Sequence, residues 1–169
     1  MRQSKLMLSL IVFIFGFTGL TFAQVTLPEV KVVSFNYRYL NSVDNKELAM
    51  PVKRLELETA AFDLKNSEFY EDVYDNYFIS FYIPEGSILA VYDKDGKLLR
   101  TAEKFKNIKI PNVVAKAVVT KYPDWKIAKD VYLVSYYSSN DESSKTYKLL
   151  LEKGNKRLRV KTNEKGEFL

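Results

Sequence analysis

The chain has 169 residues, no His and no Cys, and a formal net charge of +5. These absences exclude Ser-His-Asp and Cys-His nucleophilic sites in their usual forms, the usual zinc sites, and disulfides. The charge is unevenly distributed: residues 24–92 hold 6 Lys+Arg and 11 Asp+Glu, giving −5, and residues 93–169 hold 18 and 10, giving +8. Two solvated faces of opposite sign would account for this asymmetry. An anionic partner for the second half, or head-to-tail self-association, is the alternative.

The first 23 residues have the pattern of a secretory leader. Arg2 and Lys5 precede an apolar run over residues 6–17, and Thr21-Phe22-Ala23 places small residues at −3 and −1 of a cleavage site. We therefore expect cleavage after Ala23, a single domain over residues 24–169, and a periplasmic or secreted protein without stable membrane insertion. An uncleaved anchor is the alternative, although the run is shorter than the roughly 20 residues of a spanning helix.

The segment that follows the leader predicts one strand and one helix. Residues 30–40 are rich in β-branched and aromatic types, which is typical of a strand. Pro51 opens a stretch of good helix formers, since proline is favoured at the first helical position. Apolar or small side chains recur at helical spacing along two stripes, Val52, Leu55, Thr59 and Phe62, and Leu57, Ala61 and Leu64.

A three-strand meander is predicted next. Residues 77–83 alternate with period two, as the side chains of a strand do. Pro84-Glu85-Gly86 turns the chain into a return strand over residues 87–92. The turn Asp93-Lys94-Asp95-Gly96 then leads into a short strand over residues 97–101.

The remaining residues predict the same order of elements. Ile110-Pro111 opens a helix that Tyr122-Pro123 ends, because proline disfavours helix at the residue before it. Four strands follow, at residues 131–137, 147–153, 157–162 and 167–169. We conclude that the fold is α+β.

The two hairpin regions align at a constant offset of 70 residues. Tyr77 aligns with Tyr147, and Gly96 with Gly166. The helix-opening prolines, Pro51 and Pro111, are offset by 60, so the second half carries ten additional residues. We therefore predict two pseudo-repeated helix-plus-meander halves, at about residues 51–101 and 110–169.

The order of these motifs resembles that of the PepSY-like, β-lactamase-inhibitor-protein-like (BLIP-like) secreted domains of Bacteroidetes-type bacteria. The resemblance rests on five features: the turn Asp93–Lys97, Ile110-Pro111, Tyr122-Pro123, the strand at 147–153, and the turn Asn163–Gly166. It implies an antiparallel sheet with the helices packed on one face, and a binding or inhibitory role. Related domains restrain metallopeptidases within propeptides, and the family has no active site to carry over.

The residues that could support other chemistry have simpler interpretations. A nucleotidyltransferase such as a nicotinate-nucleotide adenylyltransferase needs a His-x-Gly-His motif, which a chain without His cannot have, and no glycine-rich nucleotide-binding motif is present. Asp93 and Asp95 resemble the start of a calcium loop, but the later ligands do not follow. A second cluster of acidic residues comprises Glu68, Glu71, Asp72 and Asp75. This cluster could bind calcium or a basic partner, or contain a glycosidase-like pair of carboxylates. A solvated connector between two elements explains these residues better. We expect no catalytic residue, metal, cofactor or nucleic acid partner.

The clearest functional signal is a difference between the halves. Phe78, Tyr82, Leu89 and Val91 would share the sheet face turned away from the helices, and their counterparts 70 residues later are Lys148, Glu152, Arg159 and Lys161. Either the segment at 30–40, with Val33, Phe35 and Tyr37, covers this apolar face, or the face is a partner surface.

Two functions remain open. The leading hypothesis is an exported, non-catalytic module that binds an unidentified protein partner and inhibits or modulates an extracytoplasmic enzyme. The alternative is an envelope-associated structural protein that associates with itself or with anionic glycan or lipid.

Overall fold

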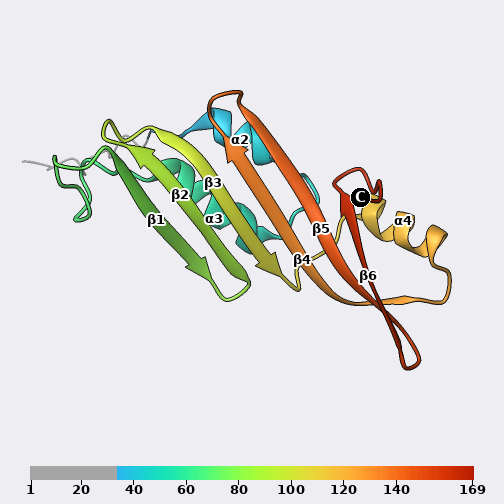
Figure 1. The fold of residues 1–169 in the computed structure, drawn as a ribbon. Helices are drawn as coiled ribbons and strands as arrows, with labels where there is room; N and C mark the ends of the chain where they lie inside the picture. Colours follow the sequence, from blue (N-terminus) through green and yellow to red (C-terminus); the bar gives the residue numbers. More distant parts are fainter. Residues whose placement is uncertain (1–33) are drawn as a thin grey trace, which may run out of the picture. The chain divides into compact units, whose positions relative to one another are not determined.

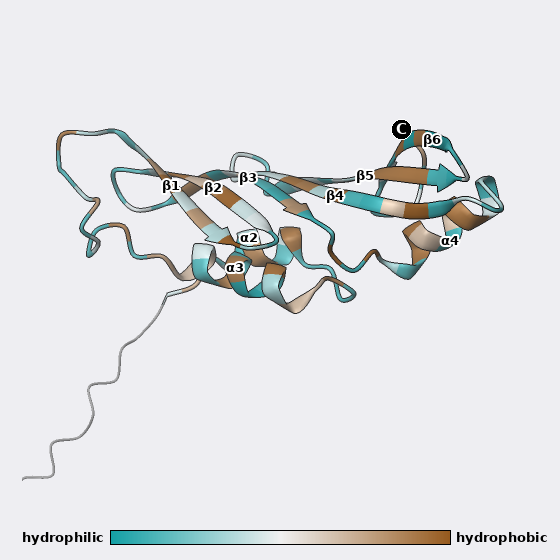
Figure 2. Cartoon of the chain, turned by 90° about the horizontal axis from the view of Figure 1, so that it is seen from below, coloured by the Kyte–Doolittle hydropathy of each residue, from teal (hydrophilic) through white to brown (hydrophobic). Residues whose placement is uncertain are grey.

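A computed structural model describes residues 34–169, in which three helices lie on one side of a six-stranded sheet (Figures 1 and 2). The described residues belong to one compact unit. The predicted leader and its cleavage site lie outside the described residues. The elements in chain order are α2 (Tyr37–Val43), α3 (Met50–Ala61), β1 (Asn76–Ile83), β2 (Gly86–Asp93), β3 (Leu98–Lys106), α4 (Asn112–Lys121), β4 (Lys126–Tyr137), β5 (Glu142–Lys153) and β6 (Lys156–Asn163).

The sheet is an antiparallel meander in the order β1-β2-β3-β4-β5-β6, so each strand pairs with its neighbour in sequence. This arrangement confirms the α+β fold with an antiparallel sheet and helices on one face. No helix within the described part of the chain is long and apolar enough to cross a membrane.

The predicted strand at 30–40 is wrong over its described part. Residues 34–36 have no regular structure, and Tyr37 begins α2. Asn36 caps this helix, because its side chain accepts a hydrogen bond from the Tyr39 backbone N–H at 3.0 Å. Tyr39 and Val43, four residues apart, are both fully buried on one side of the helix. Helical spacing and a cap therefore outweigh the strand propensity of the aromatic and β-branched side chains.

The other two helices begin close to their prolines. In α3, Val52, Leu55 and Thr59 are buried, while Leu57 of the second stripe is 46% exposed. In α4, Val114 and Val118 are buried against the sheet, and Tyr122 caps the helix before Pro123. The first stripe of α3 is thus the one that faces the core.

The core lies between the helices and one face of the sheet. Its centre is a stack of aromatic rings from neighbouring strands, with centroids 6.4 Å apart for Phe105 and Tyr132 and 4.6 Å apart for Tyr132 and Tyr147. Side chains alternate along each strand, so the residues between these core positions point to the opposite face. We call that opposite side the open face.

Several strands extend beyond their predicted limits. β4 begins at Lys126 and β5 at Glu142, five residues before the predicted starts at 131 and 147. These additional residues are mostly charged or polar, and pairing with a neighbouring strand holds them in the sheet despite their low strand propensity. Residues 167–169 form only an isolated bridge, Thr162↔Phe168, in place of the predicted strand.

Two hairpins match at the predicted offset of 70. The β1–β2 ladder runs from Asn76↔Asp93 to Ile83↔Gly86, and the β5–β6 ladder from Thr146↔Asn163 to Lys153↔Lys156. The turns that follow also match: the Asp93 and Asn163 side chains each accept two backbone N–H bonds, and Gly96 and Gly166 have φ of 80° and 79°. β4 has no strand counterpart in the first half, where residues 62–75 form a loop, so the repeat of whole halves stays a prediction.

Candidate binding surface

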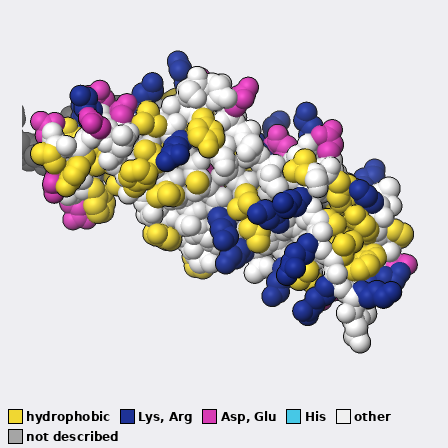
Figure 3. Space-filling view, viewed as in Figure 1, with side chains coloured by type: hydrophobic (Ala, Val, Ile, Leu, Met, Phe, Trp, Pro, Cys, Tyr) yellow, Lys and Arg dark blue, Asp and Glu magenta, His cyan; other side chains and the backbone are white. Residues whose placement is uncertain are grey.

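The open face of β1 and β2 carries the four residues that the sequence singled out. The register pairs Phe78 with Val91 and Ser80 with Leu89, which places the side chains of both strands on the face opposite the helices. Tyr82 lies two residues beyond Ser80 on the same strand. We call Phe78, Tyr82, Leu89 and Val91 the aromatic patch; Figure 3 views the face that carries it.

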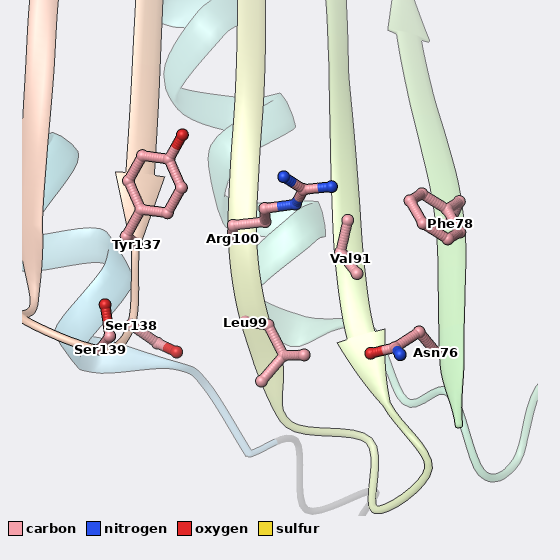
Figure 4. A pocket seen from close by; sticks show the side chains of 8 residues that line it. All are labelled: Asn76, Phe78, Val91, Leu99, Arg100, Tyr137, Ser138 and Ser139. Atoms are coloured by element: carbon pink, nitrogen blue, oxygen red, sulfur yellow. The ribbon is translucent and has the colours of Figure 1, made fainter.

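The members of the aromatic patch differ in exposure. Phe78 is 62% exposed, Tyr82 74% and Leu89 41%, whereas Val91 is only 6% exposed. Val91 shares the open face with Phe78, as the alternation predicts, but it is mostly covered there, because its short side chain lies between those of Phe78 and Arg100 (Figure 4). Val91 thus forms the floor of the patch beside Phe78.

The predicted cover of this face is not found in the described residues. Phe35 packs partly buried against the core, and Tyr37 begins α2, which contacts α3, β4 and β5. Both residues therefore belong to the helix side of the sheet. Val33 lies outside the described residues.

Two residues that the sequence did not single out extend the patch across the sheet. The register aligns Phe78 with Val91, Val91 with Arg100, and Arg100 with Tyr137, so that one transverse row crosses β1 to β4. Arg100 is exposed and Tyr137 is 50% exposed. We call Phe78, Val91, Arg100 and Tyr137 the transverse row.

The transverse row borders a shallow hollow of about 400 Å³ (Figure 4). Its lining adds Leu99 from β3, Asn76 at the start of β1, and Ser138 and Ser139 after β4. The hollow thus combines apolar side chains, a guanidinium and several hydroxyls. Such a lining can hold an apolar side chain of a partner while donating hydrogen bonds at its rim.

The rest of the open face is basic. Figure 3 shows cationic side chains over the strands from β3 to β6. Cross-strand pairs of like charge occur, such as Lys148 with Lys161. The exposed cations on this face are Arg100, Lys104, Lys106, Lys126, Lys129, Lys148, Arg157, Arg159 and Lys161. The positive excess of the second half is therefore partly collected on one surface.

The two carboxyl groups whose pKa values are raised most lie on the opposite side of the sheet, inside the core. Glu56 of α3 and Glu103 of β3 are each 3% exposed. Burial, with repulsion from Glu103 next, raises the pKa of Glu56 to about 9, and burial raises the pKa of Glu103 to about 7. Tyr39 Oη and Thr101 Oγ1 both donate to Glu103 Oε1 at 2.8 Å. Because the helices cover both carboxyls, they are closed to a substrate.

The acidic candidates from the sequence have structural roles or lie in solvent. Asp93 Oδ1 accepts the backbone N–H groups of Asp95 and Lys97 at 3.0 and 2.9 Å, as the turn interpretation expects. The acidic residues of the connector are all exposed on the loop between α3 and β1. Within residues 34–169, no group of three or more His, Cys, Asp or Glu side chains is placed to hold a metal ion.

Comparisons with known proteins give one fold-level likeness. No protein-family model matches the chain, and no curated protein matches it. Among solved structures, the chain is similar to a BLIP-like protein from Bacteroides fragilis, with 18% identity, a TM-score of 0.33, and coverage of 59% of this chain and 68% of that one. At this similarity the likeness carries no argument about function.

Proposed function

We propose that this chain is an exported, non-catalytic binding module that holds a protein partner on its open face. The observation that carries the proposal is the exposure of two aromatic side chains on the open face of β1: Phe78, which lines the hollow of the transverse row, and Tyr82, further along the same strand. Contiguous apolar surface on a folded protein usually marks an interaction site. Tyr and Arg are also the residue types that contribute most to binding at protein interfaces.

The geometry favours a protein over a small molecule as the partner. The hollow is shallow and lies on a sheet face, whereas sites for small ligands are concave and enclose most of the ligand. Phe78 and Tyr82 present large rigid surfaces, and the Tyr hydroxyl adds a hydrogen-bonding tip. We propose further that the partner is an extracytoplasmic enzyme whose activity is restrained by binding. This finer proposal draws on the resemblance of the motif order to inhibitory domains.

The experiment compares three variants of the chain that begins at Gln24. Phe78→Ser with Tyr82→Ser removes the exposed rings of β1, and Tyr137→Ser removes the far end of the transverse row. Val113→Ser with Val119→Ser is the matched control, because these exposed apolar residues lie on α4. Partner capture from the native periplasm should be lost in the first two variants and retained in the control.

Thermal unfolding distinguishes a binding role from a structural one. Substitutions at exposed positions usually change stability by less than about 0.5 kcal/mol, so the midpoints of all three variants should stay near that of the unsubstituted chain. Unfolding of the Phe78 and Tyr82 variant would show that these rings are part of the core and would refute the binding surface. Equal capture of the partner by the α4 control, by the Phe78 and Tyr82 variant and by Tyr137→Ser would also refute the binding surface.

The basic part of the open face favours a second candidate function, association with an anionic glycan or lipid of the envelope. Interactions between exposed charges are screened over about 8 Å at physiological ionic strength. Binding to vesicles that contain anionic lipid should therefore weaken steeply with added salt if this candidate holds. Capture through the aromatic patch should change little with salt, which separates the two functions.

A further inference from the structure

The two outer strands of the sheet differ in how their free edges are protected. β6 carries cations at Lys156, Arg157, Arg159 and Lys161. The end of the chain also lies along β6, because Leu169 N–H donates to Lys161 O at 3.0 Å and Phe168 forms a bridge with Thr162. Charged residues and a covering segment are the usual means by which proteins prevent an edge strand from pairing with another chain.

Over the described part of the chain, β1 has none of these protections. Its eight residues, Asn76–Ile83, include no charged residue and no proline, and six of them are aromatic or β-branched, distributed over both faces of the strand. Among the described residues, only β2 pairs with it. Figure 1 shows β1 as the outermost strand of its side of the sheet. An uncharged edge of this length is a template for adding another strand.

The free backbone groups of β1 belong to alternate residues. The β1–β2 hairpin closes on the pair Ile83↔Gly86 around two turn residues, so this pair faces inward along the ladder. In an antiparallel ladder, inward and outward residues alternate. Phe78, Ser80 and Tyr82 therefore direct their N–H and C=O groups toward the free side of β1.

The sequence of β1 is nearly symmetric about Ser80. Reading outward from this residue, Ile79 matches Phe81, and Phe78 matches Tyr82. An antiparallel copy of the same strand, centred on Ser80, would place each Phe78 opposite a Tyr82 on the open face. Ile79 would lie opposite Phe81 on the helix face. Aromatic and β-branched cross-strand pairs of this kind stabilise antiparallel sheets.

We propose that two copies of this chain associate through antiparallel pairing of β1 with β1, centred on Ser80. The pairing is isologous, so a two-fold axis passes beside Ser80 and closes the assembly at two copies. Ser80 is the outward-facing residue on this axis, which allows it to exchange backbone hydrogen bonds with its own copy. The internal symmetry of the strand favours a second copy over an unrelated extended peptide, which would need no such symmetry in β1.

The test uses charge at the axis. In the chain from Gln24, Ser80→Lys or Ser80→Glu places two like charges opposite each other in the pair, and should raise the dimer dissociation constant by about tenfold or more. An equimolar mixture of the two variants places Lys opposite Glu and should restore association. Ser80 is exposed, so neither variant should lose thermal stability. Ser144→Lys is the matched control, since Ser144 is an exposed serine on the same face of β5.

Sedimentation equilibrium over the micromolar range gives the outcomes. A concentration-dependent dimer for the unsubstituted chain and for Ser144→Lys, with monomers for each Ser80 variant and a dimer for their mixture, supports the proposal. A monomer for the unsubstituted chain, an unchanged dimer for a Ser80 variant, or a mixture that stays monomeric would overturn it. This measurement uses the purified chain alone, so its outcome does not depend on capture of a partner. Partner capture is tested separately by Tyr137→Ser, which lies on β4 and not on β1.

Discussion

Glu56→Gln should make the protein more stable at alkaline pH and leave its stability nearly unchanged in acid. The Glu56 carboxyl is buried, and its pKa is raised from 4.5 to about 9. Between these values the folded protein holds a proton that the unfolded chain releases. The free energy of unfolding therefore falls as the pH rises, by about 1.4 kcal/mol for each pH unit while the proton is retained.

The magnitude follows from the interval over which the proton is held. At pH 7, retention from the unfolded value of 4.5 corresponds to roughly 3 kcal/mol. The local contacts also indicate that burying these carboxyl groups lowers the free energy of unfolding, because Glu56 Oε1 and Glu103 Oε2 have no hydrogen-bond partner among the described residues. Lys145 partly offsets it, but its ammonium already binds Glu164 at 3.1 Å. Gln cannot ionise, so by the same arithmetic the variant should be more stable by about 4–5 kcal/mol at pH 8.

Urea unfolding followed by tyrosine and tryptophan fluorescence, from pH 4.5 to pH 9, measures this difference. Glu58→Gln is the matched control, because Glu58 is exposed on the same helix. The difference in unfolding free energy between Glu56→Gln and the unsubstituted chain should grow with pH, and the control should show no such growth. A difference that stays constant or shrinks as the pH rises would refute the assignment of a buried, protonated Glu56.

Two further predictions concern the turns and the leader. Gly86→Ala should destabilise the protein by at least about 2 kcal/mol, because an added Cβ would overlap the Lys104 carbonyl oxygen and lie 2.8 Å from Phe105 Cα. Gly154→Ala, with φ of 56° and nothing within 4 Å, should cost only about 1 kcal/mol, and equal losses in thermal unfolding would contradict the comparison. Mass spectrometry of the protein isolated from its native cells should find Gln24 at its start, and an intact segment 1–23 in the membrane fraction would contradict the predicted cleavage.

Local patterns were sufficient to predict most of the architecture. Pro51 and Pro111 marked two helix starts, and the period-two alternation marked the core strands, because these signals depend only on neighbouring residues. The helix α2 could not be predicted in this way. Its seven residues carry strand-forming side chains, and its stability depends on the Asn36 cap and on Tyr39, whose hydroxyl donates to Glu103 64 positions later.

The candidate site was only half predictable, and the reason is a β-bulge. Phe78 and Tyr82 follow from alternation along a single strand. Strict alternation along β3 from the buried Leu98 would turn Arg100 into the core. The register shifts between Val91 and Tyr92, so that Leu98 lies opposite Tyr92 while Arg100 lies opposite Val91 on the open face.

This bulge also determines the partner of Arg100 on its other side. From Arg100 onward, β3 pairs with β4 without any register shift, and this places Tyr137 opposite Arg100. Leu99, the additional residue in β3, becomes part of the lining of the hollow. A bulge depends on pairing with a neighbouring strand rather than on local spacing, so no pattern within β3 could reveal it. The aromatic patch is thus encoded locally, whereas the guanidinium and the phenol that complete the transverse row depend on how three strands pair.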